Sequence, residues 1–338
     1  MSSGTTDTAP GGIVYRVDEL LPAAWRPLAE AGPVRTFNPG LVRDGAGWLF
    51  AYRVVAPDGA RRIGICRLDT SLRVVNDSQL PLSDHLVVGG AARPDTYPEV
   101  ARRWFADPRL YRFGERLFIY WNTGWHEPKN HQFLQELDPL SLQPIGPARE
   151  LLVNGLVRQK LEKNWTLFGT DCAQVFAIYS ITPHRVLVTS LVTEGDIVFE
   201  AVAVTPLPLD DYPPCHGGLR GGAPPQWTGH DYLSFCHSVH DGASGYRYAA
   251  AAYRFSASAP FVPTHRPRVS LSLHNPFGGE RVHPALNPAV GEVIYPCGAA
   301  RDGDRWLVSH GINDEHCAIS FLDDPRIEAT LARCASSE

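Results

Sequence analysis

Residues 104–121 have the sequence WFADPRLYRFGERLFIYW, in which two runs of alternating apolar and polar residues flank a short polar turn. Alternation with a period of two is typical of strands that bury one face. Pro108 cannot donate a ladder hydrogen bond and marks the beginning of the first strand. The stretch therefore predicts a β-hairpin with Asp107 and Arg109 at its entrance.

Similar hairpins recur along the chain. Their second strands are spaced by roughly 60 to 70 residues, which leaves room for about five four-stranded units. Aromatic residues, valine, glycine and proline are abundant, whereas lysine is rare, as expected for β structure. We therefore predict an all-β fold, a five-bladed β-propeller. The further hairpins are expected at residues 40–53, 224–237 and 297–311, with a weaker copy at 170–181.

The chain of 338 residues is expected to form one cooperative unit, because all-β propellers of this size often do. We predict a disordered N-terminal tail over residues 1–12 and a single propeller domain over residues 13–323. Residues 324–338 are expected to form a C-terminal helix or tail. A second short helical pattern, from Val17 to Glu30, is interrupted by prolines.

Charge and composition exclude several classes of partner. The formal net charge is −5 and no run of like charges is present, which argues against nucleic acid or a lipid surface as a ligand. No apolar stretch reaches membrane-spanning length. The seven cysteines are scattered and unpaired in sequence, which favours buried free thiols in a reducing cytoplasm and predicts no zinc site. We expect a cytoplasmic protein that binds a small neutral or anionic molecule; an oligomer is possible.

Polar residues stand at the ends of the predicted strands. Asn38 precedes a proline and is expected to be extended, so it is interpreted either as a turn residue or as a side chain aimed along the strand axis. Arg53 ends the second strand on the same rim. Asp107 and Arg109 are either a structural ion pair or a general acid beside an arginine that fixes an anionic or polyhydroxyl ligand. Both interpretations are open from this stretch alone.

Two further segments carry candidate binding residues. Lys163 lies before Asn164 and a tryptophan, which suits either a sugar or phosphate contact or a loop lysine beside a core aromatic residue. In residues 214–225, four glycines surround Arg220 and follow His216. Glycines let the backbone approach a ligand and expose amide donors, which suits an oxyanion; the alternative, a flexible loop, fits less well with the prolines at both ends of the segment. No helix follows, so the segment is not a nucleotide-binding fingerprint.

Several short motifs coincide with the predicted strand ends. In chain order they are Asn38-Pro39, Tyr52-Arg53, Asp107-Pro108-Arg109, Lys163-Asn164, Gly221 to Pro225, His237, Tyr246 to Tyr248, Tyr295 to Gly298 and Gly311 to Asp314. As an ordered set they resemble the motifs of glycoside hydrolase family 130, which contains β-mannoside phosphorylases and β-1,2-mannosidases. The resemblance extends from about Phe37 to Asp314 and implies a five-bladed propeller with an axial active site.

The resemblance also implies roles for individual residues. Asp107 is the expected catalytic residue, which supplies the proton to the leaving oxygen of an inverting reaction, relayed through a sugar hydroxyl. Inorganic phosphate or a phosphorylated sugar donor is the expected co-substrate, with no metal or other cofactor. The family usually has glutamate where this chain has Ala106, which removes a nearby charge. Predicted substrate-binding residues are Asn38, Arg53, Arg109, Asn164, Tyr248 and Asp314, and predicted phosphate-binding residues are Lys163, His216, Arg220 and His237.

Four functions follow from this interpretation. The first is an inverting β-mannoside phosphorylase, because phosphate is already a nucleophile and needs no general base. The second is a mannosyltransferase that uses a mannosyl phosphate or nucleotide donor. A β-mannosidase, which needs a second carboxylate to activate water, is third. The alternative from another class is a non-catalytic propeller that binds a sugar or oligosaccharide.

Overall fold

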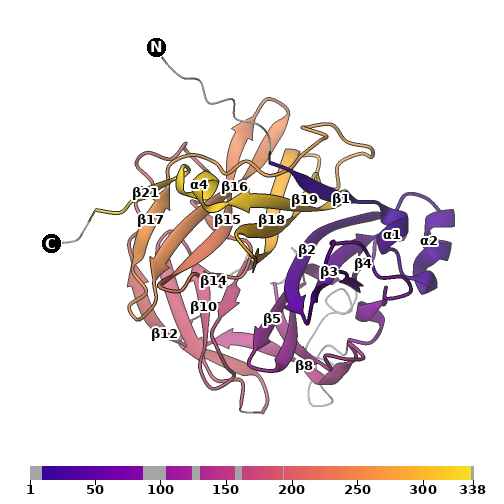
Figure 1. The fold of residues 1–338 in the computed structure, drawn as a ribbon, viewed down its shortest axis with the longest axis horizontal. Helices are drawn as coiled ribbons and strands as arrows, with labels where there is room; N and C mark the ends of the chain where they lie inside the picture. The colour runs from indigo at the N-terminus through magenta and orange to yellow at the C-terminus, as the bar shows by residue number, and fades with distance from the viewer. Residues whose placement is uncertain (1–9, 87–103, 124–129, 157–161, 193, 336–338) are drawn as a thin grey trace.

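The protein consists mainly of β-strands. Its structure is a computed structural model that describes residues 10–86, 104–123, 130–156, 162–192 and 194–335. In Figure 1 the strands follow one another around the picture in chain order, as the colours show. The few helices in the described residues are short. The prediction of an all-β fold is confirmed.

Strands of the first half form three groups, which we call meanders, and within each group every strand pairs antiparallel with the next one along the chain. Consecutive pairing of this kind needs only short connections. The first meander is β2 (Arg35–Asp44), β3 (Gly47–Val55) and β4 (Arg61–Leu68). The second is β5 (Ala106–Phe113), β6 (Arg116–Asn122), β7 (Gln132–Leu137) and β8 (Pro144–Val153). The third is β9 (Thr166–Phe168), β10 (Val175–Ser180), β11 (His184–Thr189) and β12 (Ile197–Thr205). The parallel pair β8–β12 joins the second and third groups into one eight-stranded sheet.

The second half contains two more meanders. In the fourth, β13 (Arg220–Gly221) and β14 (Gln226–Trp227) both pair with β15 (Asp231–Gly242), followed by β16 (Gly245–Ser256) and β17 (Pro263–Pro267). The fifth is β18 (Val290–Asp302), β19 (Arg305–Ile312) and β20 (His316–Asp323), to which β1 (Gly12–Tyr15) adds as the last strand. The N-terminal strand therefore completes the C-terminal meander. The expected hairpins at 40–53, 104–121 and 297–311 coincide with β2–β3, β5–β6 and β18–β19, whereas 170–181 covers only a turn and β10.

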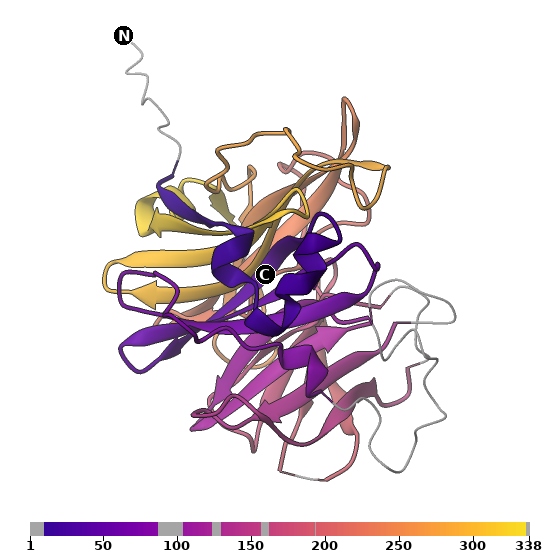
Figure 2. The same ribbon diagram turned by 90° about the vertical axis from the view of Figure 1, so that its right-hand side faces the viewer.

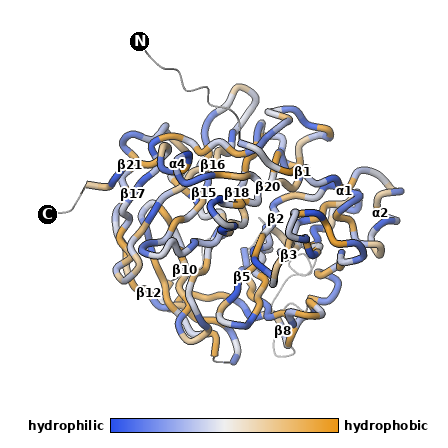
Figure 3. Tube along the Cα trace, viewed as in Figure 1, coloured by the Kyte–Doolittle hydropathy of each residue, from blue (hydrophilic) through white to orange (hydrophobic). Residues whose placement is uncertain are grey.

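Hydrophobic clusters lie between successive meanders of the described chain. One cluster joins the first meander to the second, and others join the second to the third, the third to the fourth and the fourth to the fifth. A further cluster contains Phe50 and Cys66 of the first meander together with Leu307 and Ile319 of the fifth. Hydrophobic burial therefore holds the last meander against the first and closes the arrangement. Figure 3 shows how hydrophobic and hydrophilic residues recur along these strands.

The first strands of the meanders pack against one another. A methyl group on Gly40 of β2 would lie 2.9 Å from the carbonyl oxygen of Pro108 in β5, and one on Gly221 of β13 would lie 1.9 Å from that of Asn164. Real side-chain carbons do not approach backbone this closely, so these positions require glycine. The beginnings of these strands are thus brought together, and with them Asn38, Asp107 and Asn164.

Short strands lie near both ends of the described chain. Residues 1–9 of the expected N-terminal tail lie outside the described part, and β1 begins at Gly12, the last residue of that tail. At the C-terminus α4 (Asp324–Glu328) is the expected helix, but β21 (Leu331–Arg333) follows it and pairs with β17. The described helices near the N-terminus are α1 (Val17–Leu20), a 3-10 turn (Ala23–Trp25) and α2 (Arg26–Glu30). In Figure 2 these indigo helices lie beside the first meander.

Two other features bear on the sequence predictions. None of the helices in the described residues is both long and apolar enough to cross a membrane. All seven cysteines fall within the described residues and are free thiols, and Cys66, Cys236 and Cys317 are fully buried.

Candidate active site

Asp107 occupies an irregular position near the beginning of β5. The pairing of β5 with β6 shifts register between Ala106 and Arg109, and the backbone of Asp107 has a φ of 52°. Such a bulge leaves residues unpaired and re-aims a side chain. Aspartate and asparagine tolerate the left-handed conformation better than most residues do. Asn38 in β2 has the same φ and lies in an equivalent bulge, again before a proline.

The two bulges bring Asn38 and Asp107 into contact. The side-chain amide of Asn38 donates a hydrogen bond of 2.8 Å to Oδ1 of Asp107, and Nη1 of Arg53 lies 3.4 Å from the same oxygen. The side chains of Arg53 and Asp107 are only 13% and 10% exposed. Burial alone would raise the pKa of Asp107, but the charges of Arg53 and Lys163 and the Asn38 hydrogen bond together hold it below the ordinary carboxyl value. Asp107 is therefore a carboxylate in the free protein.

Lys163 approaches Asp107 from the segment before β9. Neighbouring backbone is fixed, since the amide of Glu162 donates to Oδ1 of Asn130 at 3.1 Å and Gln132 donates to the carbonyl oxygen of Glu162. Burial lowers the pKa of Lys163, and Asp107 opposes this shift. Arg53 and Lys163 therefore both interact electrostatically with the carboxylate of Asp107.

Asp314, in the turn between β19 and β20, also interacts electrostatically with Asp107 and Arg53. Its backbone has a φ of 57°, as expected for a tight turn built on an acidic residue. Burial raises the pKa of Asp314 and the charge of Asp107 raises it further, while Arg53 opposes the shift. The two carboxyl groups therefore differ: Asp107 is held ionised, whereas Asp314 retains its proton more readily.

The fourth meander contributes Arg220 and His237. The two residues face each other in the pairing of β13 with β15. The imidazole of His237 stacks on Tyr248 at 5.7 Å and meets the edge of Tyr295 at 4.6 Å. Burial, followed by the charges of Arg220 and Lys163, lowers the pKa of His237 well below its ordinary value. His237 is consequently neutral. The positive charges that act on Asp107 are those of Arg53, Lys163 and Arg109, and Arg220 acts on Lys163 and His237.

Arg109 lies buried beside the site, and its charge helps to lower the pKa of Asp107. Its side chain is fully buried, and its Nε donates to the carbonyl oxygen of Gly222 at 2.6 Å and its Nη2 to the hydroxyl of Tyr295 at 2.9 Å. The bulge inserts one residue between Ala106 and Arg109 and so breaks the two-residue alternation along β5. Arg109 ties β5 to the fourth and fifth meanders and is a positioning residue.

His216 also lies outside the cluster. Its side chain is 47% exposed, and its Nε2 lies 2.9 Å from Oδ1 of Asp241 near the exposed end of the β15–β16 hairpin. A carboxylate at that distance competes with any phosphate. The backbone carbonyl of His216 instead accepts a hydrogen bond of 3.0 Å from Nη2 of Arg220. The segment therefore holds Arg220 rather than adding a second anion ligand.

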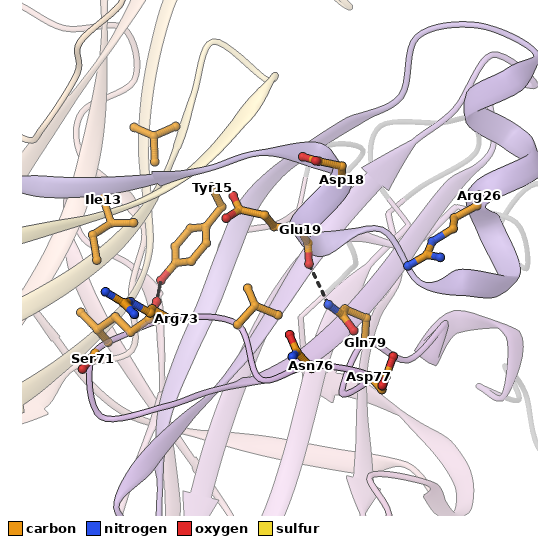
Figure 4. A pocket seen from close by; sticks show the side chains of 13 residues that line it. Ile13, Tyr15, Asp18, Glu19, Arg26, Ser71, Arg73, Asn76, Asp77 and Gln79 are labelled. Carbon is orange, nitrogen blue, oxygen red and sulfur yellow. Dashed lines mark hydrogen bonds between the residues drawn. The ribbon is translucent and has the colours of Figure 1, made fainter.

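In the described residues no group of three or more histidine, cysteine, aspartate or glutamate side chains could hold a metal ion. A separate cavity of about 860 Å³ lies between the β1–α1 segment and the loop after β4, and carries none of the predicted site residues. Figure 4 shows its polar walls, in which Tyr15 donates to the carbonyl oxygen of Leu72 at 2.7 Å and Gln79 to that of Glu19 at 2.8 Å.

Known proteins match this chain through structure alone. No protein-family model matches the sequence, and the comparison with curated proteins finds no match. The structure of β-1,2-mannobiose phosphorylase from Listeria innocua is 13% identical in sequence and superimposes with a TM-score of 0.60, over 95% of this chain and 99% of that one. The chain has the fold of a mannoside phosphorylase.

Two further known structures share this fold. One belongs to the GH130 family of mannoside phosphorylases, described as containing hydrolases that target β-1,2-mannosidic linkages in Candida mannan (TM-score 0.61, 13% identity, 95% of this chain and 96% of that one). The other is a GDP-Man-dependent mannosyltransferase from Leishmania mexicana (TM-score 0.56, 11% identity, 95% and 91%). The predicted resemblance to glycoside hydrolase family 130 is confirmed at the level of the fold.

Tyr295 appears in the sequence analysis only as part of a motif, with no role in the site, although it contacts two of the predicted site residues. Its hydroxyl accepts from Arg109 and donates a hydrogen bond of 2.8 Å to Oδ1 of Asn164, so Asn164 is held in place at the site. Tyr295 precedes Pro296 at a register shift of β18, as Asn38 and Asp107 precede prolines in β2 and β5. The shared pattern of a polar residue, a proline and a bulge is the signal that could have found it.

Proposed function

We propose that this protein is an enzyme that cleaves or forms β-mannosidic bonds with phosphate, as an inverting β-mannoside phosphorylase does. The observation that carries the proposal is the grouping of Asp107 with Arg53, Lys163 and Arg220, four residues drawn from four different meanders. A carboxylate among several cations suits a reaction in which an anion and a proton-transferring group meet at one carbon. The fold shared with phosphorylases supports it.

In the direction of cleavage, an oxygen of inorganic phosphate attacks the anomeric carbon from the face opposite the leaving group. The bond from that carbon to the glycosidic oxygen breaks, and the leaving oxygen takes a proton that Asp107 supplies through a sugar hydroxyl. The products are a mannose 1-phosphate of inverted configuration and the shortened sugar. Phosphate bound beside Arg53 and Lys163 offsets the positive charge that keeps Asp107 ionised, which favours protonation of Asp107 when phosphate is present.

In the direction of synthesis the same residues work in reverse. Asp107 is already a carboxylate in the free protein and accepts the proton of the attacking sugar hydroxyl, while the phosphate of a mannosyl donor leaves toward Arg53, Lys163 and Arg220. This ionised resting state favours the second candidate, a mannosyltransferase that uses a mannosyl phosphate or nucleotide donor. Both reactions place a phosphoryl group against the anomeric carbon.

Hydrolysis is less well supported. An inverting hydrolase needs a carboxylate that removes a proton from water. Asp314 is the second carboxyl group in the field of Asp107, and its raised pKa makes it a weaker candidate for an ionised base. We assign Asp314 instead, with Asn38, Asn164 and Tyr248, to the sugar hydroxyl groups, for which a protonated carboxyl is also a suitable partner.

We further propose that the five meanders are the blades of a single five-bladed propeller, with Asp107 near its axis. The hydrophobic clusters between successive meanders, including the cluster between the fifth and the first, support this arrangement. The expected ligand is a small sugar or oligosaccharide, and the co-substrate is inorganic phosphate or a phosphorylated sugar donor. A cytoplasmic location, the absence of nucleic-acid partners and the oligomeric state stay predictions.

The test is product analysis with β-1,2-mannobiose in the presence and absence of inorganic phosphate, and with mannose plus mannose 1-phosphate or GDP-mannose. Phosphate-dependent release of mannose 1-phosphate is the expected result, and consumption of GDP-mannose alone would support the transferase. Free mannose made equally well without phosphate would contradict both.

Two variants sharpen the assay. Lys163→Met is expected to raise the KM for phosphate about tenfold or more, since charge-assisted hydrogen bonds are worth about 1.5 to 3 kcal/mol. Arg16→Gln is the matched control, because that side chain is 71% exposed in a surface ion pair. Sugar binding that Asp107→Asn leaves unchanged, with no turnover by either protein, would favour the non-catalytic alternative.

A further inference from the structure

Trp227 in β14 is unusual among the described tryptophans because its side chain is accessible. It is 53% exposed, whereas Trp48, Trp165 and Trp306 are at most 3% exposed. Its ring contacts Tyr232 at 5.4 Å in a tilted arrangement. An accessible indole beside a cavity is typical of a binding site, since a flat apolar ring with a polar edge suits a ligand with one apolar face.

The surroundings of Trp227 lie at the end of the first strands that is opposite to Asp107. A cavity of about 510 Å³ is lined there by the ends of β2, β5, β9, β14 and β18, with Arg43 and Trp227 among its walls. Arg43 lies five positions after Asn38 in the same strand, which corresponds to about 16 Å of extended chain. The cavity is thus separate from the candidate active site.

A second cavity, of about 480 Å³, shares Trp227 and Arg301 with the first. It is formed by the turn between β14 and β15 and by residues of β16, β17, β19 and α4. Each of the two cavities falls within the volume range of small-molecule sites. Because they share two wall residues, one extended ligand could occupy both.

The charged groups of the second cavity are paired with one another. Nη1 of Arg254 lies 2.9 Å from Oδ1 of Asp231 and its Nη2 2.5 Å from Oε1 of Glu328. Arg301 donates two hydrogen bonds, of 2.7 and 2.8 Å, to the carboxylate of Asp324. These pairs hold polar atoms in fixed positions and leave no surplus positive charge in their network. The walls therefore suit hydroxyl groups of a neutral ligand better than an anion.

We propose that these two cavities form a second carbohydrate-binding site, in which one ring of a neutral oligosaccharide stacks on Trp227. Sugar rings present an apolar face of C–H groups and a rim of hydroxyls, and the rim would meet the carboxylates of Asp231 and Asp324 and the imidazole of His265. Burial lowers the pKa of His265, so it is a neutral hydrogen-bonding group. The site binds sugar without chemistry and does not depend on the proposed reaction.

The experiment uses the full chain carrying Asp107→Asn, so that sugars bind without turnover. The probes are β-1,2-linked mannotetraose, maltotetraose and cellotetraose, each titrated by isothermal calorimetry. At least one of the three sugars is expected to bind at the second site. Trp227→Ala should weaken that binding about tenfold or more, and Trp227→Phe should largely retain it. Leu140→Ala, which removes an 87% exposed side chain elsewhere, is the control and should leave binding unchanged.

The outcomes separate this site from the active site. Loss of one binding event in Trp227→Ala, with kcat/KM for mannobiose unchanged in the Trp227→Ala variant of the otherwise wild-type protein, supports the proposal. Failure of the mannobiose assay alone would refute the proposed reaction and leave the calorimetric result standing. The proposal is overturned if none of the three sugars shows an event sensitive to Trp227, or if Leu140→Ala weakens binding equally.

Discussion

Replacing Asp107 by asparagine should destabilise the free protein, because it leaves the buried positive charge of Arg53 without its carboxylate partner. Nη1 of Arg53 lies 3.4 Å from the carboxylate, and both side chains are at most 13% exposed. At an effective dielectric constant of about 20, two unit charges at this distance attract by about 5 kcal/mol. Desolvation offsets part of this attraction, and removal of one partner from a buried pair typically costs about 3 to 5 kcal/mol. With about 2 °C per kcal/mol for a chain of this size, the melting temperature should fall by about 6 to 10 °C.

Inorganic phosphate should restore much of this loss. In the Asp107→Asn protein, a bound phosphate meets Arg53, Lys163 and Arg220 without a carboxylate at position 107 to repel it. A repulsion between unit charges about 6 Å apart amounts to about 3 kcal/mol under the same dielectric constant, or about a hundredfold in affinity. A ligand that binds only the folded state stabilises it in proportion to the logarithm of its concentration over Kd. Phosphate should therefore raise the melting temperature of the variant more than that of the wild type.

The assay is thermal unfolding at pH 7.5 with 10 mM phosphate or with chloride at equal ionic strength. Asp18→Asn is the matched control: Asp18 also pairs with an arginine, at 2.8 Å, but is 69% exposed, and such pairs contribute about 0 to 1 kcal/mol. The reasoning is refuted if Asp107→Asn melts at or above the wild type in chloride and phosphate raises both proteins equally. Loss of the proton-transferring group should also lower kcat by about 10² to 10⁴-fold.

Two further predictions concern neighbours of Asp107. Because the pKa of Asp314 is raised in the folded protein, its contribution to stability is fully present below the ordinary carboxyl pKa of 3.8 and is lost as pH rises through the folded value. Asp314→Asn should therefore raise the melting temperature at pH 8 and leave it unchanged at pH 3.5. A lower melting temperature of the variant at pH 8 would contradict this. A methyl group on Gly311 would lie 2.0 Å from Oδ1 of Asn38, so Gly311→Ala should displace Asn38 from Asp107 and lower kcat/KM about tenfold. Gly279→Ala is the control and should retain activity, because a methyl group there would have no atom within 4 Å. Equal activities of the two variants would refute this account.

The sequence predicted the hairpins and the residues at the beginnings of the first strands, because both depend on local chemistry. Alternating apolar residues around polar turns define β2–β3, β5–β6 and β18–β19 without reference to the rest of the chain. Asn38 and Asp107 were found because a proline after a polar residue marks an interrupted ladder. The bulge itself was not visible in the pattern. Neither were the partners of Arg109, whose fully buried side chain donates to Gly222 and Tyr295, residues more than 100 positions away in the chain.

The glycine-rich segment shows why the remaining features depend on the closed fold. Four glycines around Arg220 suggested a loop whose amides face a phosphate. Instead, Gly221 lies against the backbone of Asn164, and a methyl group on Gly222 would lie 2.9 Å from the carbonyl oxygen of Pro296, so both glycines serve the close packing of first strands from different meanders. Their neighbours are far away in sequence, and no local pattern encodes that contact. The same packing brings the cations of three meanders to Asp107, so a substitution that separates the first strands should weaken anion binding even when it changes no charged residue.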